Sequence, residues 1–126
     1  MDNIQINKLN WTVKWSDANT ISALAEQNKS TGYAFGQIDI VYLQILLNKE
    51  IHPDLIFKTI VHELIHAYLF SYGWTKYTYD EEQICDFISS HIVDLITNAN
   101  KILLDYNNQQ KESKNKEETV DDSNNQ

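Results

Sequence analysis

Five consecutive residues, His62-Glu-Leu-Ile-His66, carry the most specific chemistry in this chain of 126 residues. Residues four apart share one face of an α-helix, so both imidazoles can reach a single metal ion. His-Glu-x-x-His on a helix is a pattern typical of zinc binding, with the glutamate as general base. Glu63 would lie beside the metal and could take a proton from zinc-bound water without being a ligand. The sequence therefore predicts a Zn²⁺ site with His62 and His66 as ligands and Glu63 as the catalytic residue.

A catalytic zinc site needs at least one further protein ligand and an open position for water. A second helix is expected directly after Asp80, because Asp80 and Gln83 form a capping-box pattern. On this helix we predict Glu82 as the third ligand. Asp86 shares its face and is predicted to orient a ligand imidazole by accepting its hydrogen bond. Three residues remain alternatives for the third ligand: Glu81, Cys85 and His91.

His62-Glu63-x-x-His66 followed by Glu82-x-x-x-Asp86 resembles the gluzincin metallopeptidases, whose third ligand is a glutamate on the next helix. The short intracellular members of the ImmA/IrrE type are similar in layout. The phrase HELIHAYLF is also similar to SprT-like and Spartan-type metalloproteases, which use a later third histidine in a His-Gly context. After His66 this chain has only His91. The resemblance covers about residues 31 to 96 and implies a zincin-like fold and cleavage of a regulatory protein in a bacterium, phage or mobile element.

The residues around the motif predict a helix that runs from about Pro53 to Gly73. Proline suits the first helical turn, the Asp54 carboxylate complements the positive N-terminal end, and Gly73 suits a C-terminal stop. An apolar stripe with helical spacing is expected to face the core: Ile56, Phe57, Ile60, Val61, Leu64, Ile65, Tyr68 and Leu69. A second face is expected to look into a cleft: Leu55, Thr59, His62, His66 and Phe70.

The chain ahead of this helix is expected to supply strands. Trp11, Val13 and Trp15 alternate with polar residues and predict a half-buried strand, which Ile4 and Ile6 extend or precede as a separate strand. A short helix is expected around residues 21 to 25.

The stretch Thr31–Tyr42 predicts a strand or hairpin with Ile38, Ile40 and Tyr42 on one face. In a zincin-like fold it would form the edge of the cleft, where an extended substrate can pair with it. Leu43–Asn48 is expected to lead into the motif helix through a short helix of its own.

Beyond Gly73 the aromatic connector is expected to pack over the core. The alternative role for Tyr77 or Tyr79 is to stabilise an oxyanion during hydrolysis. The second helix is predicted from Glu81 to about Tyr106, and the polar residues 107–126 are predicted to be a disordered tail. One domain over residues 1–106 follows.

The overall composition narrows the function classes. The formal net charge is −8, the ten basic residues are all lysines, and no basic patch is evident, so we expect no nucleic-acid partner. One cysteine excludes an internal disulfide framework. No apolar run resembles a signal peptide or a membrane span, which leads us to expect a cytoplasmic protein with no membrane partner.

Together these patterns predict an α+β fold: a small zincin-like domain with a short mixed or antiparallel sheet packed on the HExxH helix and a long second helix. The predicted function is a zinc metallopeptidase acting on a protein or peptide substrate, with the oligomeric state left open. Two alternatives stay open. One is a catalytically inactive zinc-binding interaction module, and the other is a metal-free interaction protein whose motif helix is purely structural.

Overall fold

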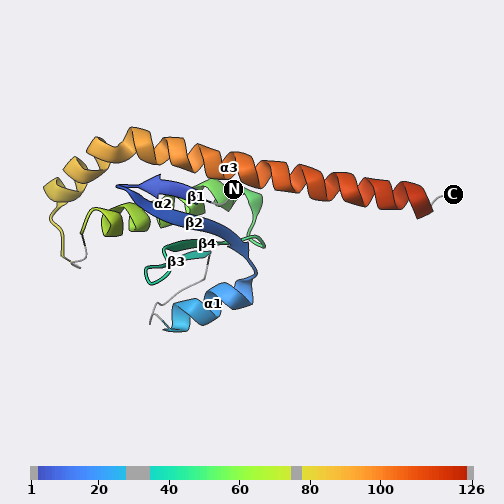
Figure 1. Ribbon diagram of the computed structural model, residues 1–126, viewed down its shortest axis with the longest axis horizontal. Coiled ribbons are helices and arrows are strands. Elements are labelled where there is room, and N and C mark those ends of the chain that lie inside the picture. The colour runs from blue at the N-terminus through green and yellow to red at the C-terminus, as the bar shows by residue number, and fades with distance from the viewer. Residues whose placement is uncertain (1–2, 28–34, 75–77, 125–126) are drawn as a thin grey trace.

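The computed structural model describes residues 3–27, 35–74 and 78–124, and it confirms an α+β fold. The elements follow in the order β1 (Asn3–Ile6), β2 (Leu9–Ser16), α1 (Ala18–Gln27), β3 (Gly36–Asp39), β4 (Gln44–Asn48), the single 3₁₀ turn η1 (Pro53–Leu55), α2 (Ile56–Ser71) and α3 (Glu81–Asn124). Figure 1 shows the strands together, α1 to one side of them, and α3 running back along the layer that contains α2.

The four strands form one mixed sheet in the order β1-β2-β4-β3. β1 and β2 are antiparallel, as are β3 and β4, whereas β2 and β4 are parallel. The predicted strand around Trp11 is β2, and the residues before it form the separate strand β1. Asn7 and Lys8 join the two with φ angles of 48° and 67°, the left-handed conformation that a tight two-residue hairpin turn requires.

The main core lies between the sheet and the two longer helices. In the β2–β4 register Val13 pairs with Ile45 and Trp15 with Leu47, and these side chains face α2 and α3. Leu46 points to the opposite face, where α1 contacts β3 and β4. β4 is thus buried on both faces, as is typical of a strand with a parallel neighbour inside a sheet.

Two predictions for the segment between α1 and α2 were wrong. The strand β3 ends at Asp39, so Ile40 and Tyr42 lie in a turn and are 51% and 74% exposed. The turn forms because the Asp39 carboxylate accepts hydrogen bonds from the Val41 and Tyr42 amides. Residues 31–34 lie outside the described part of the chain. Leu43–Asn48 does not form a short helix but becomes the buried strand β4.

The predicted ends of the helices are confirmed where the local chemistry is strong. Gly73, with φ of 84°, follows the end of α2. At the start of α3 the Gln83 amide donates to the Asp80 carboxylate at 2.8 Å. The Asp80 amide donates back to the Gln83 side-chain oxygen at 3.1 Å. This is the reciprocal pair that the capping box predicts.

α3 continues to Asn124, past the predicted end of the second helix near Tyr106. The apolar spacing does end near Tyr106, and the side chains from Asn107 to Lys114 are all exposed. Helix formation continues because the segment contains no proline or glycine and many good helix formers such as Gln, Lys and Glu. The last turns therefore project past the sheet, as Figure 1 shows. Within the described residues, no helix is long and apolar enough to cross a membrane.

Candidate metal and catalytic site

The motif helix α2 is fixed to the sheet along one side and at its C-terminal end. Its buried residues follow helical spacing: Ile56, Thr59, Ile60, Glu63, Leu64, Ala67, Tyr68 and Ser71. At the end of the helix, the buried indole nitrogen of Trp11 donates to Ser71 Oγ at 2.9 Å. The Asn7 side-chain amide donates to the Ser71 carbonyl at 2.9 Å. Both anchors come from the β1–β2 hairpin, so the sheet sets the position of the motif.

His62 and His66 lie side by side next to this buried face. Their ring centroids are 5.0 Å apart at an interplanar angle of 70°, and the His62 side chain is 65% exposed. Partial burial, together with the neighbouring His62, lowers the pKa of His66. The neutral imidazole, which is the form that binds a metal, is therefore favoured at His66. The two solvent-exposed rings lie on consecutive turns of the helix, and each has a nitrogen atom that can bind a metal ion.

Glu63 differs from the histidines because it points into the protein. The residue is 6% exposed, and its carboxylate oxygen Oε1 lies 4.0 Å from His62 Nε2. Burial raises the pKa of Glu63 to about 7. A carboxyl group with a pKa near the working pH is well suited to general base chemistry. The motif predicted the role of Glu63 but not this burial, and Thr59, expected on the open face, is buried as well.

The edge strand β3 lies directly over Glu63. Gly36 is so near that a Cβ added to it would be 2.8 Å from Glu63 Cγ. β3 is an edge strand of the sheet, which is the position expected for a strand that borders a cleft. Gly36 was not recognised from the sequence, although a glycine in a strand is a signal of close backbone approach.

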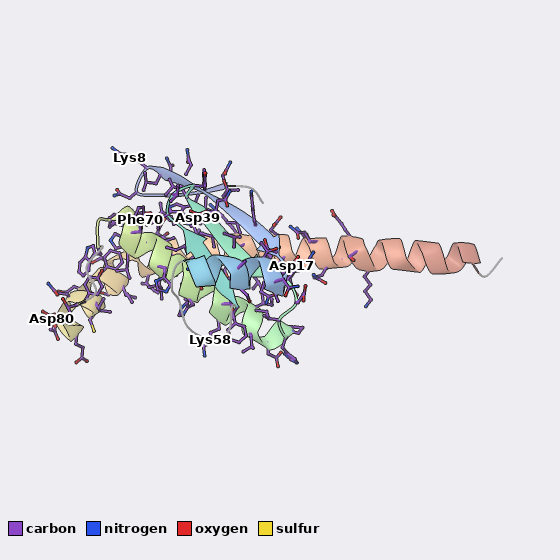
Figure 2. The ribbon with its side chains drawn as sticks, turned by 90° about the horizontal axis from the view of Figure 1, so that it is seen from below. Lys8, Asp17, Asp39, Lys58, Phe70 and Asp80 are labelled. Carbon is purple, nitrogen blue, oxygen red and sulfur yellow. The ribbon has the colours of Figure 1, made fainter. Side chains whose placement is uncertain are left out.

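The predicted third ligand, Glu82, is not brought to the two histidines. α3 packs antiparallel to α2: Tyr72 contacts Phe87 and His91, and the Tyr68 hydroxyl bonds to Asp94. Glu82 precedes Asp94 by 12 residues, roughly 18 Å of helix at 1.5 Å per residue. In Figure 2, Asp80 at the start of α3 correspondingly lies beyond the Phe70 end of α2, away from Lys58.

The face of α2 that contacts α3 is also not the face of the histidines. Tyr68 follows His66 by two residues, roughly 200° of rotation around the helix axis. Across the described residues, no three His, Cys, Asp or Glu side chains come together in a group that could hold a metal ion. The structure thus brings the His62 and His66 rings together, with Glu63 next to them.

The other candidate residues of α3 have different surroundings. His91 packs among aromatic rings, 4.2 Å from Tyr72 and 4.7 Å from Phe87 between centroids, which matches a packing role. Cys85 and Asp86 are exposed on the first turns of the helix, as are both glutamates there.

The aromatic connector packs on itself. The Tyr79 hydroxyl donates to the Trp74 carbonyl at 2.7 Å, and its ring lies 5.2 Å from that of Trp74. This hydroxyl is therefore engaged within the connector, as packing of these rings predicts. Tyr77, the other candidate for an oxyanion donor, lies outside the described residues.

No protein-family model, no curated protein and no solved structure matches this chain.

Proposed function

We propose that the protein is a zinc-dependent metallopeptidase that hydrolyses a peptide bond in a specific protein substrate. The observation that carries the proposal is the arrangement on α2: two adjacent, accessible imidazoles and, next to them, a buried carboxylate. The donor types fit zinc, which is bound in proteins by neutral imidazole nitrogen. The resemblance to ImmA-like proteins adds the expectation of a cytoplasmic enzyme that acts on a regulatory protein.

In this proposal His62 and His66 hold the metal and Glu63 moves the proton. A bound zinc ion would supply Lewis acidity, which makes water acidic enough to lose a proton near pH 7 and polarises a carbonyl. Glu63 accepts the proton of the attacking water and passes it to the leaving amine, so its carboxyl group alternates between two protonation states. The burial that raises the pKa of Glu63 in the metal-free protein supports a role in proton transfer.

The edge strand supports a role for β3 in holding an extended substrate. Among the described elements β3 pairs only with β4, and it passes over Glu63. A peptide added to such an edge is held through its backbone, which places a scissile bond along the strand direction. The gluzincin resemblance implies Glu82 as third ligand, whereas in the described structure Glu82 is an exposed residue at the start of α3.

The test is hydrolysis of a peptide library by the zinc-loaded protein, with new termini identified by mass spectrometry. We expect cleavage that stops when a chelator removes the metal and returns when zinc is restored. Zinc binding without any cleavage would instead support the inactive zinc-binding module. Absence of both would support the metal-free interaction protein.

A further inference from the structure

Gly36 opens the edge strand β3, and the Glu63 side chain fills the space that a side chain at position 36 would need. A Cβ at this position would lie 2.8 Å from Glu63 Cγ, 3.2 Å from Glu63 Cδ and 3.0 Å from the Leu46 carbonyl oxygen. Carbon atoms in contact pack at about 3.5–4.0 Å. An alanine at position 36 would therefore have to push the Glu63 side chain aside.

The requirement for glycine here is one of space and not of backbone conformation. Gly73 adopts a positive φ, whereas Gly36 lies in regular antiparallel register opposite Leu47. Alanine is compatible with such a backbone and, without a clash, would stabilise the fold by restricting the unfolded chain. Any loss of stability in Gly36→Ala must then come from the contacts around the new methyl group.

The register explains why this contact concerns Glu63. Gly36 and Ile38 pair with Leu47 and Ile45, whose side chains face α2. The strand backbone at Gly36 therefore lies against the aliphatic part of the Glu63 side chain (its stem), on the buried side of the helix. The carboxylate at the end of that stem stays within 4.0 Å of His62.

We propose that Gly36 is a positioning residue for Glu63: the bare backbone of β3 holds the glutamate stem so that its carboxylate stays beside the histidine pair. The catalytic consequence rests on the proposed peptidase function, whereas the contact itself rests on the geometry alone. A side chain at position 36 displaces the carboxylate and leaves the exposed imidazoles in place. Displacing a reacting group by about 1 Å can cost on the order of 100-fold in rate.

The test combines Gly36→Ala with two substitutions of Glu63 in the full, metal-free chain. Gly36→Ala should lower the Tm by roughly 5 °C, because overpacking forces neighbouring atoms to shift. Gly36→Ala should cause the same loss of Tm in a Glu63→Gln background, because glutamine has the size of glutamate. In a Glu63→Ala background most of this loss of Tm should disappear, because the crowded side-chain atoms of Glu63 are absent. Gln37→Ala, one residue further along β3, is the control and should leave the Tm nearly unchanged.

An equal loss of Tm in the Glu63→Ala background would overturn the inference, since strain elsewhere would then explain it. If Gly36→Ala does not fold, a folded Gly36→Ala/Glu63→Ala double variant supports the contact. An unfolded double variant beside a folded Glu63→Ala overturns it.

Zinc content and peptide-library hydrolysis are measured on the same variants. They separate the positioning role of Gly36 from the proposed peptidase function. Gly36→Ala should bind as much zinc as the wild type and lose roughly 10- to 100-fold in hydrolysis. Undiminished hydrolysis would overturn the positioning role. Absence of zinc from every variant would refute the peptidase function and leave the Tm comparison to decide the contact.

Discussion

Replacing Glu63 by glutamine is expected to abolish most hydrolysis while zinc remains bound. Glutamine has the shape of glutamate but cannot accept the proton of the attacking water, and general base catalysis contributes roughly 10²- to 10⁴-fold to a rate. The measurement is the initial rate of peptide-library cleavage by zinc-loaded wild type and Glu63→Gln, with zinc content determined on both. A variant that cleaves at the wild-type rate would show that Glu63 is not the base.

The same substitution should also make the metal-free protein more stable above neutral pH. Burial raises the pKa of Glu63 from 4.5 to about 7, so the folded state binds its proton more tightly than the unfolded state does. The stability that this group contributes is complete below pH 4.5 and is lost as the pH rises through 7. At pH 8 we therefore expect Glu63→Gln to exceed the wild type by up to about 3 kcal/mol in free energy of unfolding.

Urea unfolding of the metal-free proteins at pH 5 and pH 8 measures this difference. Glu82→Gln is the matched control, because Glu82 is an exposed carboxylate in the same chain. We expect no comparable change in the control. A Glu63→Gln variant that is less stable than the wild type at pH 8 would contradict the raised pKa of the buried Glu63 carboxyl group.

Trp11→Ala is expected to have the largest effect on the fold. Trp11 is fully buried, its indole nitrogen donates to Ser71 Oγ, and Phe70 contacts its ring edge to face at 6.0 Å. Removing a buried aromatic side chain typically costs about 3–5 kcal/mol. Because these contacts fix the end of α2, the loss should appear as reduced free energy of unfolding in urea.

Trp15→Ala is the control for this prediction. Trp15 is only partly buried, and its ring is tilted against that of Tyr106 with 4.8 Å between the centroids. Its indole nitrogen finds no hydrogen-bond partner among the described residues. We expect a clearly smaller loss than for Trp11. Equal losses would mean that the hydrogen bond from Trp11 to Ser71 adds nothing to the free energy of unfolding.

The sequence predicted the elements whose signals are local. The motif helix, its stop at Gly73, the capping box of Asp80 and Gln83 and the alternating strand β2 all follow from spacing and side-chain chemistry within a few residues. Such features depend on contacts inside one segment, which is why the pattern contains them.

The features that were missed depend on contacts between segments. Leu43–Asn48 is apolar on both faces as β4, and a short apolar run carries no period that separates strand from helix. The length of α3 was missed because apolar spacing reports packing, and the side chains from Asn107 to Lys114 are all exposed.

The position of Glu82 relative to the two histidines also depends on contacts between segments. Glu82 lies on the correct kind of element with a suitable neighbour four residues on. The offset between α2 and α3, however, is set by aromatic packing of Tyr72 with Phe87 and His91, which no sequence pattern reveals. The burial of Glu63 likewise depends on Gly36, 27 positions earlier in the chain.

The most direct measurement is a zinc titration of the purified wild type and of His62→Ala and His66→Ala, with His91→Ala and Glu82→Ala alongside. We expect one zinc per wild-type chain. Removing an outer-shell partner of a metal ligand typically costs roughly 10- to 100-fold in metal affinity. His62→Ala and His66→Ala should each lose more zinc affinity than that. His91→Ala should bind like the wild type, and Glu82→Ala decides whether the start of α3 joins the site. A wild type that binds no zinc, or motif variants that bind it equally well, would contradict the metal centre on α2.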